Sequence, residues 1–169
     1  MKIFKGIIVS KEEEEIAKIL ENINIFRTLT PNERVKIVRY FEQETYKPGE
    51  MIVKEGEEGD RMFIIKEGAV KVTKKLADGG EEVLANLVDG DFFGEMALLD
   101  GSPRSASVYA VSPVQMLELY RSSLEEFIQK NPGAGVKILY NIAVILAKRI
   151  RSTGDRIRDL IVWQSLLQK

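Results

Sequence analysis

The sequence predicts a mainly β protein with flanking helices: an antiparallel β jelly roll (a double-stranded β-helix) with N-terminal helices and a long C-terminal helix. Two observations predict this fold class. In the middle of the chain, short apolar or alternating runs are separated by a turn signal about every ten residues, which is typical of an antiparallel barrel or a double-sheet jelly roll. On both sides of this region the apolar residues recur three and four apart, as in an amphipathic helix.

The 169 residues suit one domain with an appendage, because a domain has roughly 150 residues. We expect three segments along the chain. They are an N-terminal helical segment over residues 1–42, the jelly roll over residues 43–120, and C-terminal helices over residues 121–169.

The N-terminal segment carries the helical period from Ser10 to about Phe41. Its second helix is predicted to begin at Thr30-Pro31-Asn32-Glu33. Here a threonine cap, a proline at the first helical position and a glutamate three residues after the cap form a capping box. The acidic run from Glu12 to Glu15 is interpreted as a solvated face near a helix N-terminus, where negative charge is favourable.

Within the jelly roll, the sequence predicts one hairpin with particular clarity. Asp78-Gly79-Gly80 separates the apolar stretch around Val70 and Val72 from the stretch at Val83 and Leu84. Turn residues of this kind join antiparallel neighbours. We therefore expect the strands on either side of this turn to pair.

The C-terminal segment returns to the helical period. Ser122 or Ser123 is expected to cap a short helix that ends before Asn131-Pro132, and a long helix follows. Positions of the long helix that alternate in steps of four and three, as the a and d positions of a coiled coil do, form what we name the seam. The seam consists of Leu139, Ala143, Leu146, Ile150, Thr153, Ile157, Leu160, Gln164 and Leu167.

The seam predicts a homodimer formed through the long helix. The alternative is a single helix that folds back on the barrel as a lid, for which a 3.6-residue period and a wider apolar stripe are expected. Gly154 lies inside this helix at a cost of about 1 kcal/mol relative to alanine. Either a partner approaches closely at Gly154 or the helix breaks there, and the sequence leaves this open.

The composition excludes several classes of site. The chain has no cysteine and no histidine, which excludes disulfides, zinc fingers, catalytic thiols and serine-histidine-aspartate triads. Its 25 Lys and Arg are balanced by 26 Asp and Glu, and the net charge of −1 argues against binding to nucleic acid or to an anionic membrane. We find no secretory signal and no apolar run of about 18 residues, so we expect a cytoplasmic protein.

The region after the central strands suggests an anion site. A glycine-led turn from Gly94 to Leu98 can form one helical turn whose free N–H groups converge on an anion, and Arg104 can return across the turn to the same anion. Glu95 would repel a bare phosphate, so it fits a ligand that also offers a hydroxyl, as a ribose beside a phosphate does. A triphosphate would call for a P-loop lysine, and the P-loop pattern is absent. The alternative is that Glu95 and Arg104 pair with each other or with neighbours and tie down a long loop.

A known sequence pattern covers residues 93–106. The pattern is F-G-E-x-A-L-x followed shortly by P-R-x-A, and the matching residues are Phe93, Gly94, Glu95, Ala97, Leu98, Pro103, Arg104 and Ala106. The segment resembles the phosphate-binding cassette of cyclic-nucleotide-binding domains of the catabolite activator and protein kinase A regulatory subunit type. We refer to residues 93–106 as the cassette. With the upstream turn glycines and strands, the resemblance extends over about residues 25–155.

The resemblance implies a jelly roll that binds cAMP or cGMP, with no metal, no cofactor and no catalysis. It implies that Glu95 accepts a hydrogen bond from the ribose 2′-OH and that Arg104 binds the exocyclic phosphate oxygens. Gly94 and Ala97 would present backbone N–H groups. Ser105 stands where the family varies, and it favours cAMP. The ligand-binding residues expected on this basis are Gly94, Glu95, Met96, Ala97, Arg104, Ser105, Ala106, Leu84, Leu87, Val72 and Thr153.

Two groups of these residues have a structural alternative. Val72, Leu84 and Leu87 are expected on the base side of the ligand, although apolar strand residues are more often plain core. The long helix resembles the dimer helix of the bacterial activators, in which a Thr-Ser pair contacts the adenine. Thr153 matches this pair but Gly154 replaces the serine, so that only the contact within one subunit is expected. A polar seam residue that sets the helix register is an equal alternative for Thr153.

The sequence thus predicts a non-enzymatic regulatory protein that binds a cyclic nucleotide and signals through its C-terminal helix to an unidentified effector protein. The sequence ends at Lys169 with no helix-turn-helix after the long helix, so we expect no contact with nucleic acid. The alternative is a dimerisation or interaction module that keeps the fold and binds no nucleotide. The choice between cAMP and cGMP and between a dimer helix and a lid stays open.

Overall fold

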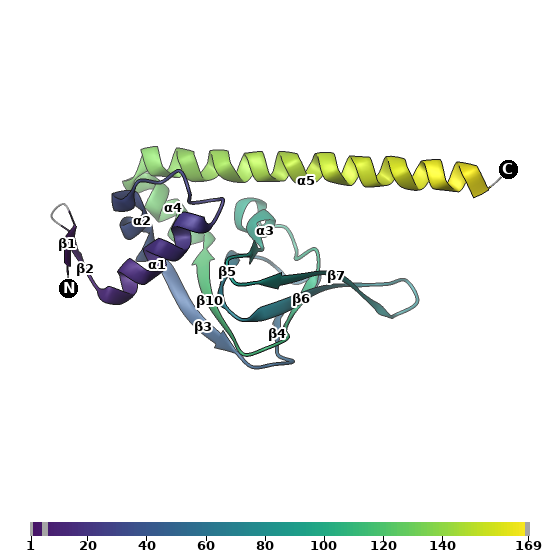
Figure 1. Cartoon of the computed structure of the whole chain (residues 1–169), viewed down its shortest axis with the longest axis horizontal. Coiled ribbons are helices and arrows are strands. Elements are labelled where there is room, and N and C mark those ends of the chain that lie inside the picture. The colour runs from purple at the N-terminus through teal and green to yellow at the C-terminus, as the bar shows by residue number, and fades with distance from the viewer. Residues whose placement is uncertain (1, 5–6, 168–169) are drawn as a thin grey trace.

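The central part of the chain folds into two four-stranded antiparallel sheets, in the strand orders β3-β10-β5-β8 and β4-β9-β6-β7 (Figure 1). The computed structural model describes residues 2–4 and 7–167. The strands are β3 (Phe41–Tyr46), β4 (Met51–Val53), β5 (Arg61–Glu67), β6 (Ala69–Lys75), β7 (Glu81–Val88), β8 (Phe92–Phe93), β9 (Ser107–Ala110) and β10 (Val114–Tyr120). Apolar side chains from both sheets form one buried cluster, which includes Phe63, Val70, Val108 and Met116. The jelly roll that the sequence predicts is confirmed.

The predicted hairpin is confirmed as well. β6 and β7 pair antiparallel along their length, and the turn between them contains Gly79 with a φ of 89°. The register of the pair shifts between Val72 and Thr73, so that Ala85 lies opposite Val72. Leu84 of β7 is the extra residue of this bulge.

The N-terminal helices are preceded by two short paired strands. These elements are β1 (Lys2–Phe4), β2 (Ile7–Val9), α1 (Lys11–Asn22) and α2 (Pro31–Val38). The capping box predicted at the start of α2 is confirmed: the Thr30 hydroxyl accepts from the Glu33 N–H at 3.3 Å, and the Glu33 carboxylate accepts from the Thr30 N–H at 2.7 Å. The prediction that the helical region continues to Phe41 is wrong, because α2 ends at Val38 and Phe41 begins β3. The Phe41 ring meets the Phe26 ring edge-on. Phe41 therefore packs against the helical cluster although it belongs to a strand.

The helices cover the outer face of the β3-β10-β5-β8 sheet. A second buried cluster lies there, with Leu20 of α1, Ile37 of α2, Leu119 of β10 and Phe127 of α4 among its members. α4 (Arg121–Lys130) and the first part of α5 (Pro132–Leu167) complete the layer. The chain therefore has one apolar cluster inside the jelly roll and another between the sheet and the helices.

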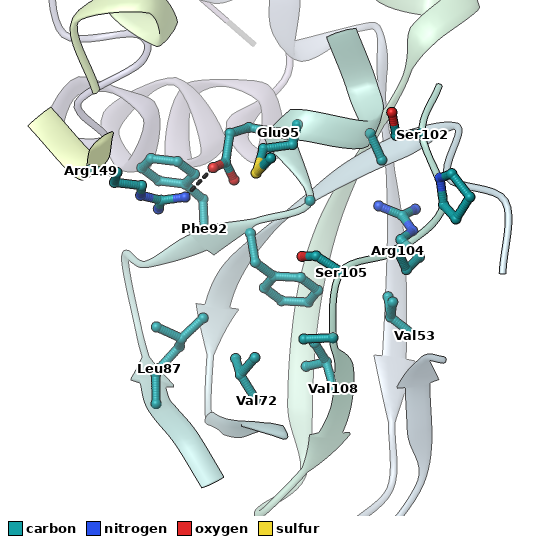
Figure 2. Close-up of a pocket in the computed structure, with 17 residues that line it drawn as sticks. Val53, Val72, Leu87, Phe92, Glu95, Ser102, Arg104, Ser105, Val108 and Arg149 are labelled. Carbon is teal, nitrogen blue, oxygen red and sulfur yellow. Dashed lines mark hydrogen bonds and ion pairs between the residues drawn. The ribbon is translucent and has the colours of Figure 1, made fainter. Parts of the chain in front are cut away.

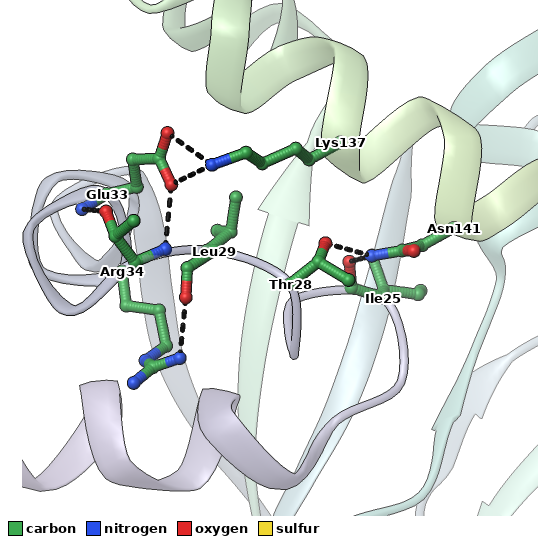
Figure 3. Close-up of polar contacts among 8 residues, drawn as sticks. Ile25, Thr28, Leu29, Glu33, Arg34, Lys137 and Asn141 are labelled. Atoms are coloured by element: carbon green, nitrogen blue, oxygen red, sulfur yellow. Dashed lines mark hydrogen bonds and ion pairs between the residues drawn. The ribbon is translucent and has the colours of Figure 1, made fainter.

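Polar contacts fix the first part of α5 to α2 and to the connection between α1 and α2 (Figure 3). Lys137 Nζ donates to both carboxylate oxygens of Glu33, at 2.9 and 2.7 Å. Asn141 Nδ2 donates to the carbonyl of Ile25 and to the hydroxyl of Thr28, each at 2.8 Å. Both contacts bridge more than 100 residues of sequence, so they hold the N-terminal segment and α5 together.

β10 continues into α4 without a loop. Tyr120 is the N-cap residue and makes no side-chain capping bond, so the predicted cap at Ser122 or Ser123 is wrong. The backbone N–H of Arg121 donates instead to the Asp60 carbonyl at 2.7 Å. The predicted end of this helix before Pro132 is confirmed.

α5 is one continuous helix of 36 residues, and Gly154 does not break it. Its first part buries Ala134 and Ile138, whereas its second part extends past the barrel (Figure 1). In the second part the seam residues Ile150 and Ile157 are 72% and 53% exposed. The side chains of Leu160, Gln164 and Leu167, which complete the predicted seam, lie outside the described residues. Within the described chain, α5 and the other helices lack the combination of length and apolar character that a membrane span requires.

Candidate functional site

A cavity of about 290 Å³ opens between the β4-β9-β6-β7 sheet, the cassette and α5 (Figure 2). Small-molecule pockets have volumes of roughly 300–1,000 Å³, so this cavity is near the lower end of that range. It is lined by Val53, Val72, Ala85, Leu87, Phe92, Phe93, Gly94, Glu95, Met96, Ala97, Ser102, Pro103, Arg104, Ser105, Ala106, Val108 and Arg149. The charged members of this lining are Glu95, Arg104 and Arg149, and the sheet contributes an apolar wall.

The cassette begins where β8 ends. Gly94 has a φ of 82°, which favours glycine, and it is followed by α3 (Glu95–Asp100), the short helical turn that the sequence predicts. A Cβ atom on Gly94 would lie 2.7 Å from Nη1 of Arg104 and 3.0 Å from the carbonyl oxygen of Arg61. Glycine is therefore needed both for the turn and for the close approach of Arg104.

Arg104 is a buried cation of the cavity, with 8% of its surface exposed. Its Nη1 donates to the Arg61 carbonyl oxygen at 2.7 Å, and its guanidinium carbon lies 5.5 Å from the centre of the Phe63 ring. Burial lowers the pKa of Arg104, and no carboxylate of the described residues is paired with it. The Asp60 and Glu118 carboxylates attract this guanidinium without forming an ion pair with it. An anion in the cavity would offset more of the cost of burying the charge.

Glu95 is almost fully buried, at 2% exposed, and it forms an ion pair with Arg149 of α5 (Figure 2). The Arg149 guanidinium also lies over the Phe92 ring, 5.7 Å from its centre. Glu95 and Arg104 are thus not bonded to each other, and each is held by a different neighbour. The pairing with neighbours that the sequence left open is present, and it leaves the Arg104 guanidinium available to an anion.

Sequence reasoning did not include Arg149 among the site residues. Arg149 follows Glu95 by 54 residues, and only the course of α5 past the cavity brings the two together. One signal was available, because Arg149 stands one helical turn before Thr153, which was expected to contact the ligand.

The apolar wall of the cavity contains two of the three strand residues that the sequence predicts for it. Val72 and Leu87 line the cavity, and so does Ala85. Leu84 does not line it and is 54% exposed. Successive strand residues face opposite sides of a sheet, so Ala85 and Leu87 share the inner face and Leu84 lies on the other one. The odd spacing between Leu84 and Leu87 already indicates this in the sequence, and Leu84 is also the extra residue of the bulge.

The remaining expected residues also divide into two groups. Met96, Ala97, Ser105 and Ala106 line the cavity. Thr153 is not part of the lining. It is exposed, and its hydroxyl donates to the Arg149 carbonyl at 2.9 Å. Thr153 therefore contacts its own helix in this structure rather than the cavity.

Comparison with known proteins bears on this arrangement. The family model described as Cyclic nucleotide-binding domain matches residues 43–131. The chain is 30% identical over 144 residues to a CRP-like cAMP-activated global transcriptional regulator of Mycobacterium tuberculosis, which is 85% of this chain and 62% of that protein. It is 35% identical over 156 residues to a cAMP-dependent protein kinase regulatory subunit of Mycosarcoma maydis, which is 90% of this chain and 28% of that protein.

A solved structure agrees with these relatives. The crystal structure of the Thermus thermophilus catabolite activator protein matches with a TM-score of 0.75 and 32% identity, over 81% of this chain and 62% of that one. The chain spans less than two thirds of the length of each of these three relatives. The family match includes the whole cassette and the strands that form the cavity wall. The chain therefore belongs to the cyclic-nucleotide-binding domain family.

Proposed function

We propose that the chain binds a cyclic mononucleotide, cAMP in preference to cGMP, in the cavity beside α3. The observation that carries this proposal is the buried guanidinium of Arg104, which lines the cavity without a carboxylate partner in the described chain. A phosphate monoanion suits such a group, because hydrogen bonds to charged groups contribute about 1.5–3 kcal/mol each. The apolar wall suits a base, since buried apolar area stabilises by roughly 25 cal/mol per Å². Ser105 supports cAMP, and so do the names of two relatives, a cAMP-activated regulator and a cAMP-dependent kinase subunit.

Glu95 supports a sugar beside that phosphate. One of its carboxylate oxygens is bonded to Arg149, and the other accepts the ribose 2′-OH. A carboxylate without such a hydroxyl would repel the phosphate. The backbone N–H groups of Gly94 and Ala97 supply further donors, because the first N–H groups of a helix have no acceptor within it.

The chain acts as a cytoplasmic sensor rather than as an enzyme. Its regulatory output passes through α5. Arg149 connects α5 to Glu95, and a ligand that bonds to Glu95 therefore changes the free energy of that contact. The exposed seam supports a homodimer in which a second copy covers Ile150 and Ile157. An effector protein responds to the position of this helix.

Calorimetric titration of the full chain with cAMP tests the proposal. Arg104→Met keeps much of the side-chain volume and removes the cation, so we expect binding at least tenfold weaker, or about 1.4 kcal/mol. Arg158→Met is the matched control, since Arg158 is an exposed residue of α5 that pairs with Asp155, and it should bind as the wild type does. Equal affinity of the Arg104 variant, or a wild type that binds no nucleotide, contradicts the proposal.

One observation favours a second function, a dimerisation or interaction module that needs no ligand. Glu95, the acidic group of the cavity, has its ion-pair partner Arg149 within the chain itself. Sedimentation of the chain with and without cAMP separates the two functions. A dimer of unchanged mass that carries no cAMP supports the module, and cAMP that sediments with the protein supports the sensor.

A further inference from the structure

We propose that Arg121, the first residue of α4, is a positioning residue that holds the cassette helix α3 in place at the cavity. Its Nε donates to the Leu98 carbonyl at 3.1 Å, and its Nη2 donates to the Ala97 carbonyl at 2.5 Å. These are the carbonyls of the two central residues of α3. The effect on ligand binding rests on the proposed function, whereas the effect on α3 itself does not.

α3 needs support from outside because it has only six residues. A helix this short is not stable alone in water, and the last carbonyls of a helix have no partner within it. The Gly101 N–H closes the end of α3 by donating to Ala97 at 3.0 Å. Arg121 bonds to the same carbonyl and to the next one, and it places a positive charge at the C-terminal end of the helix, where the helix dipole favours it.

The cassette leaves room for this guanidinium. Gly101 has a φ of 71°, and a Cβ atom there would lie 2.7 Å from both Nη1 and Nη2 of Arg121. Any other residue at this position would displace the Arg121 side chain as well as strain the backbone. The glycine at the end of α3 and the arginine at the start of α4 are therefore matched.

Arg121 also contacts the turn that orients Arg104. Its backbone N–H donates to the Asp60 carbonyl at 2.7 Å, and the next carbonyl, that of Arg61, accepts from Arg104 Nη1 at 2.7 Å. α3 in turn carries Glu95 and lies beside the cavity. Arg121 thus connects α4 both to the strand end that binds Arg104 and to the helix that carries Glu95. α4 is followed closely by α5.

Amide hydrogen exchange of the ligand-free full chain tests this role. Arg121→Met removes the side-chain donors but keeps the backbone bond to Asp60, so residues 96–101 should lose protection about tenfold while the rest of the chain keeps it. Arg121→Lys retains the charge and one donor, and it should recover part of the protection. Lys130→Met removes a cation at the far end of the same helix and should change nothing at α3. Unchanged protection at residues 96–101 in the methionine variant, or an equal loss along the whole chain, overturns the proposal.

A binding measurement separates positioning from a general loss of stability. In the wild-type background, Arg121→Met should weaken cAMP binding about tenfold. In the Glu95→Gln background, where the carboxylate that α3 presents is already gone, the same substitution should weaken cAMP binding by less than threefold. Equal losses in both backgrounds contradict a positioning role. Hydrogen exchange is measured without nucleotide, so a wild type that binds no cAMP would refute the proposed function and leave the result on α3 decisive.

Discussion

Gly59 packs tightly against two residues of the cassette, Ala97 and Arg104. A Cβ atom there would lie 2.3 Å from the Cβ of Ala97 and 3.0 Å from Nε of Arg104. Ala97 is part of α3 and Arg104 is buried, so neither can shift without disturbing the site. The glycine at this position is therefore needed for packing between the turn before β5 and the cassette.

Gly59→Ala should destabilise the fold by about 1–3 kcal/mol, because a methyl group is forced into a filled space. Gly133→Ala is the control, since a Cβ atom on Gly133 meets nothing within 4 Å. That control should be neutral or stabilising by up to about 1 kcal/mol. Urea denaturation of both variants checks this, and equal midpoints for the Gly59 variant and the wild type would contradict it.

Single residues also show which parts of the site the sequence could predict. Glu95 and Arg104 lie within one short local pattern, so their presence at one cavity followed from the sequence. Arg149 joins them from a helix that begins at residue 132, and its place depends on the angle at which α5 passes the barrel. Leu84 does not line the cavity because it is three residues from Leu87, an odd spacing that strand alternation places on the opposite face. Local patterns were sufficient for the first pair and for excluding Leu84, whereas tertiary packing decided the place of Arg149.

Among the elements, α2 and α5 are joined by the contact between Glu33 and Lys137 (Figure 3). Burial alone raises the pKa of Glu33, but hydrogen bonds from Lys137 and Thr30 together lower that pKa below its usual value of 4.5. A carboxyl group whose pKa is lowered by folding stabilises the fold above its unfolded pKa. This stabilisation is lost as the pH falls through the folded value.

Lys137→Met should therefore flatten the pH dependence of stability. We expect the free energy of unfolding of the wild type to fall more than that of the variant between about pH 6 and pH 3, so that the two curves approach each other in acid. Denaturant titrations at several pH values give this comparison. Lys148→Met, an exposed change on the same helix, should keep the wild-type slope. Parallel curves for Lys137→Met and the wild type would show that the contact contributes nothing to the pH dependence.

The second part of α5 makes a separate prediction about assembly. Ile150→Glu or Ile157→Glu places a charge at the centre of the proposed seam, where a partner helix would have to bury it, so the dimer should dissociate. Ser152→Glu adds the same charge at an exposed position outside the seam and should leave the dimer intact. Analytical ultracentrifugation distinguishes the two masses. A wild type that sediments as a monomer, or isoleucine variants that remain dimeric, would disprove the seam.

Helix and strand boundaries were predicted unevenly, for a physical reason. The capping box at Thr30 is a local chemical signal and fixed the start of α2 correctly. Phe41 continued the helical spacing but lies in β3. Its ring packs against the same apolar cluster as the helices, so the spacing of apolar residues did not distinguish the strand from the helix. The start of α4 carries no capping side chain, since its backbone is bonded to the β5 side of the jelly roll through Asp60.

Across the whole molecule, the cavity lies where the two apolar clusters meet. Phe93 belongs to the cluster inside the jelly roll and stacks on Phe63 with ring centres 4.8 Å apart. Its neighbour Phe92 packs against the helical cluster and lies beneath Arg149. A ligand in the cavity therefore contacts side chains that belong to both layers, and this arrangement links binding to the position of the helices.

The most direct test of the account is a crystal structure of the full chain with cAMP. The account predicts the phosphate within hydrogen-bonding distance of Arg104, the ribose 2′-OH on Glu95 and the base against Val72 and Leu87. Crystals grown at saturating cAMP in which this cavity holds no nucleotide, or in which the phosphate lies away from Arg104, would contradict it.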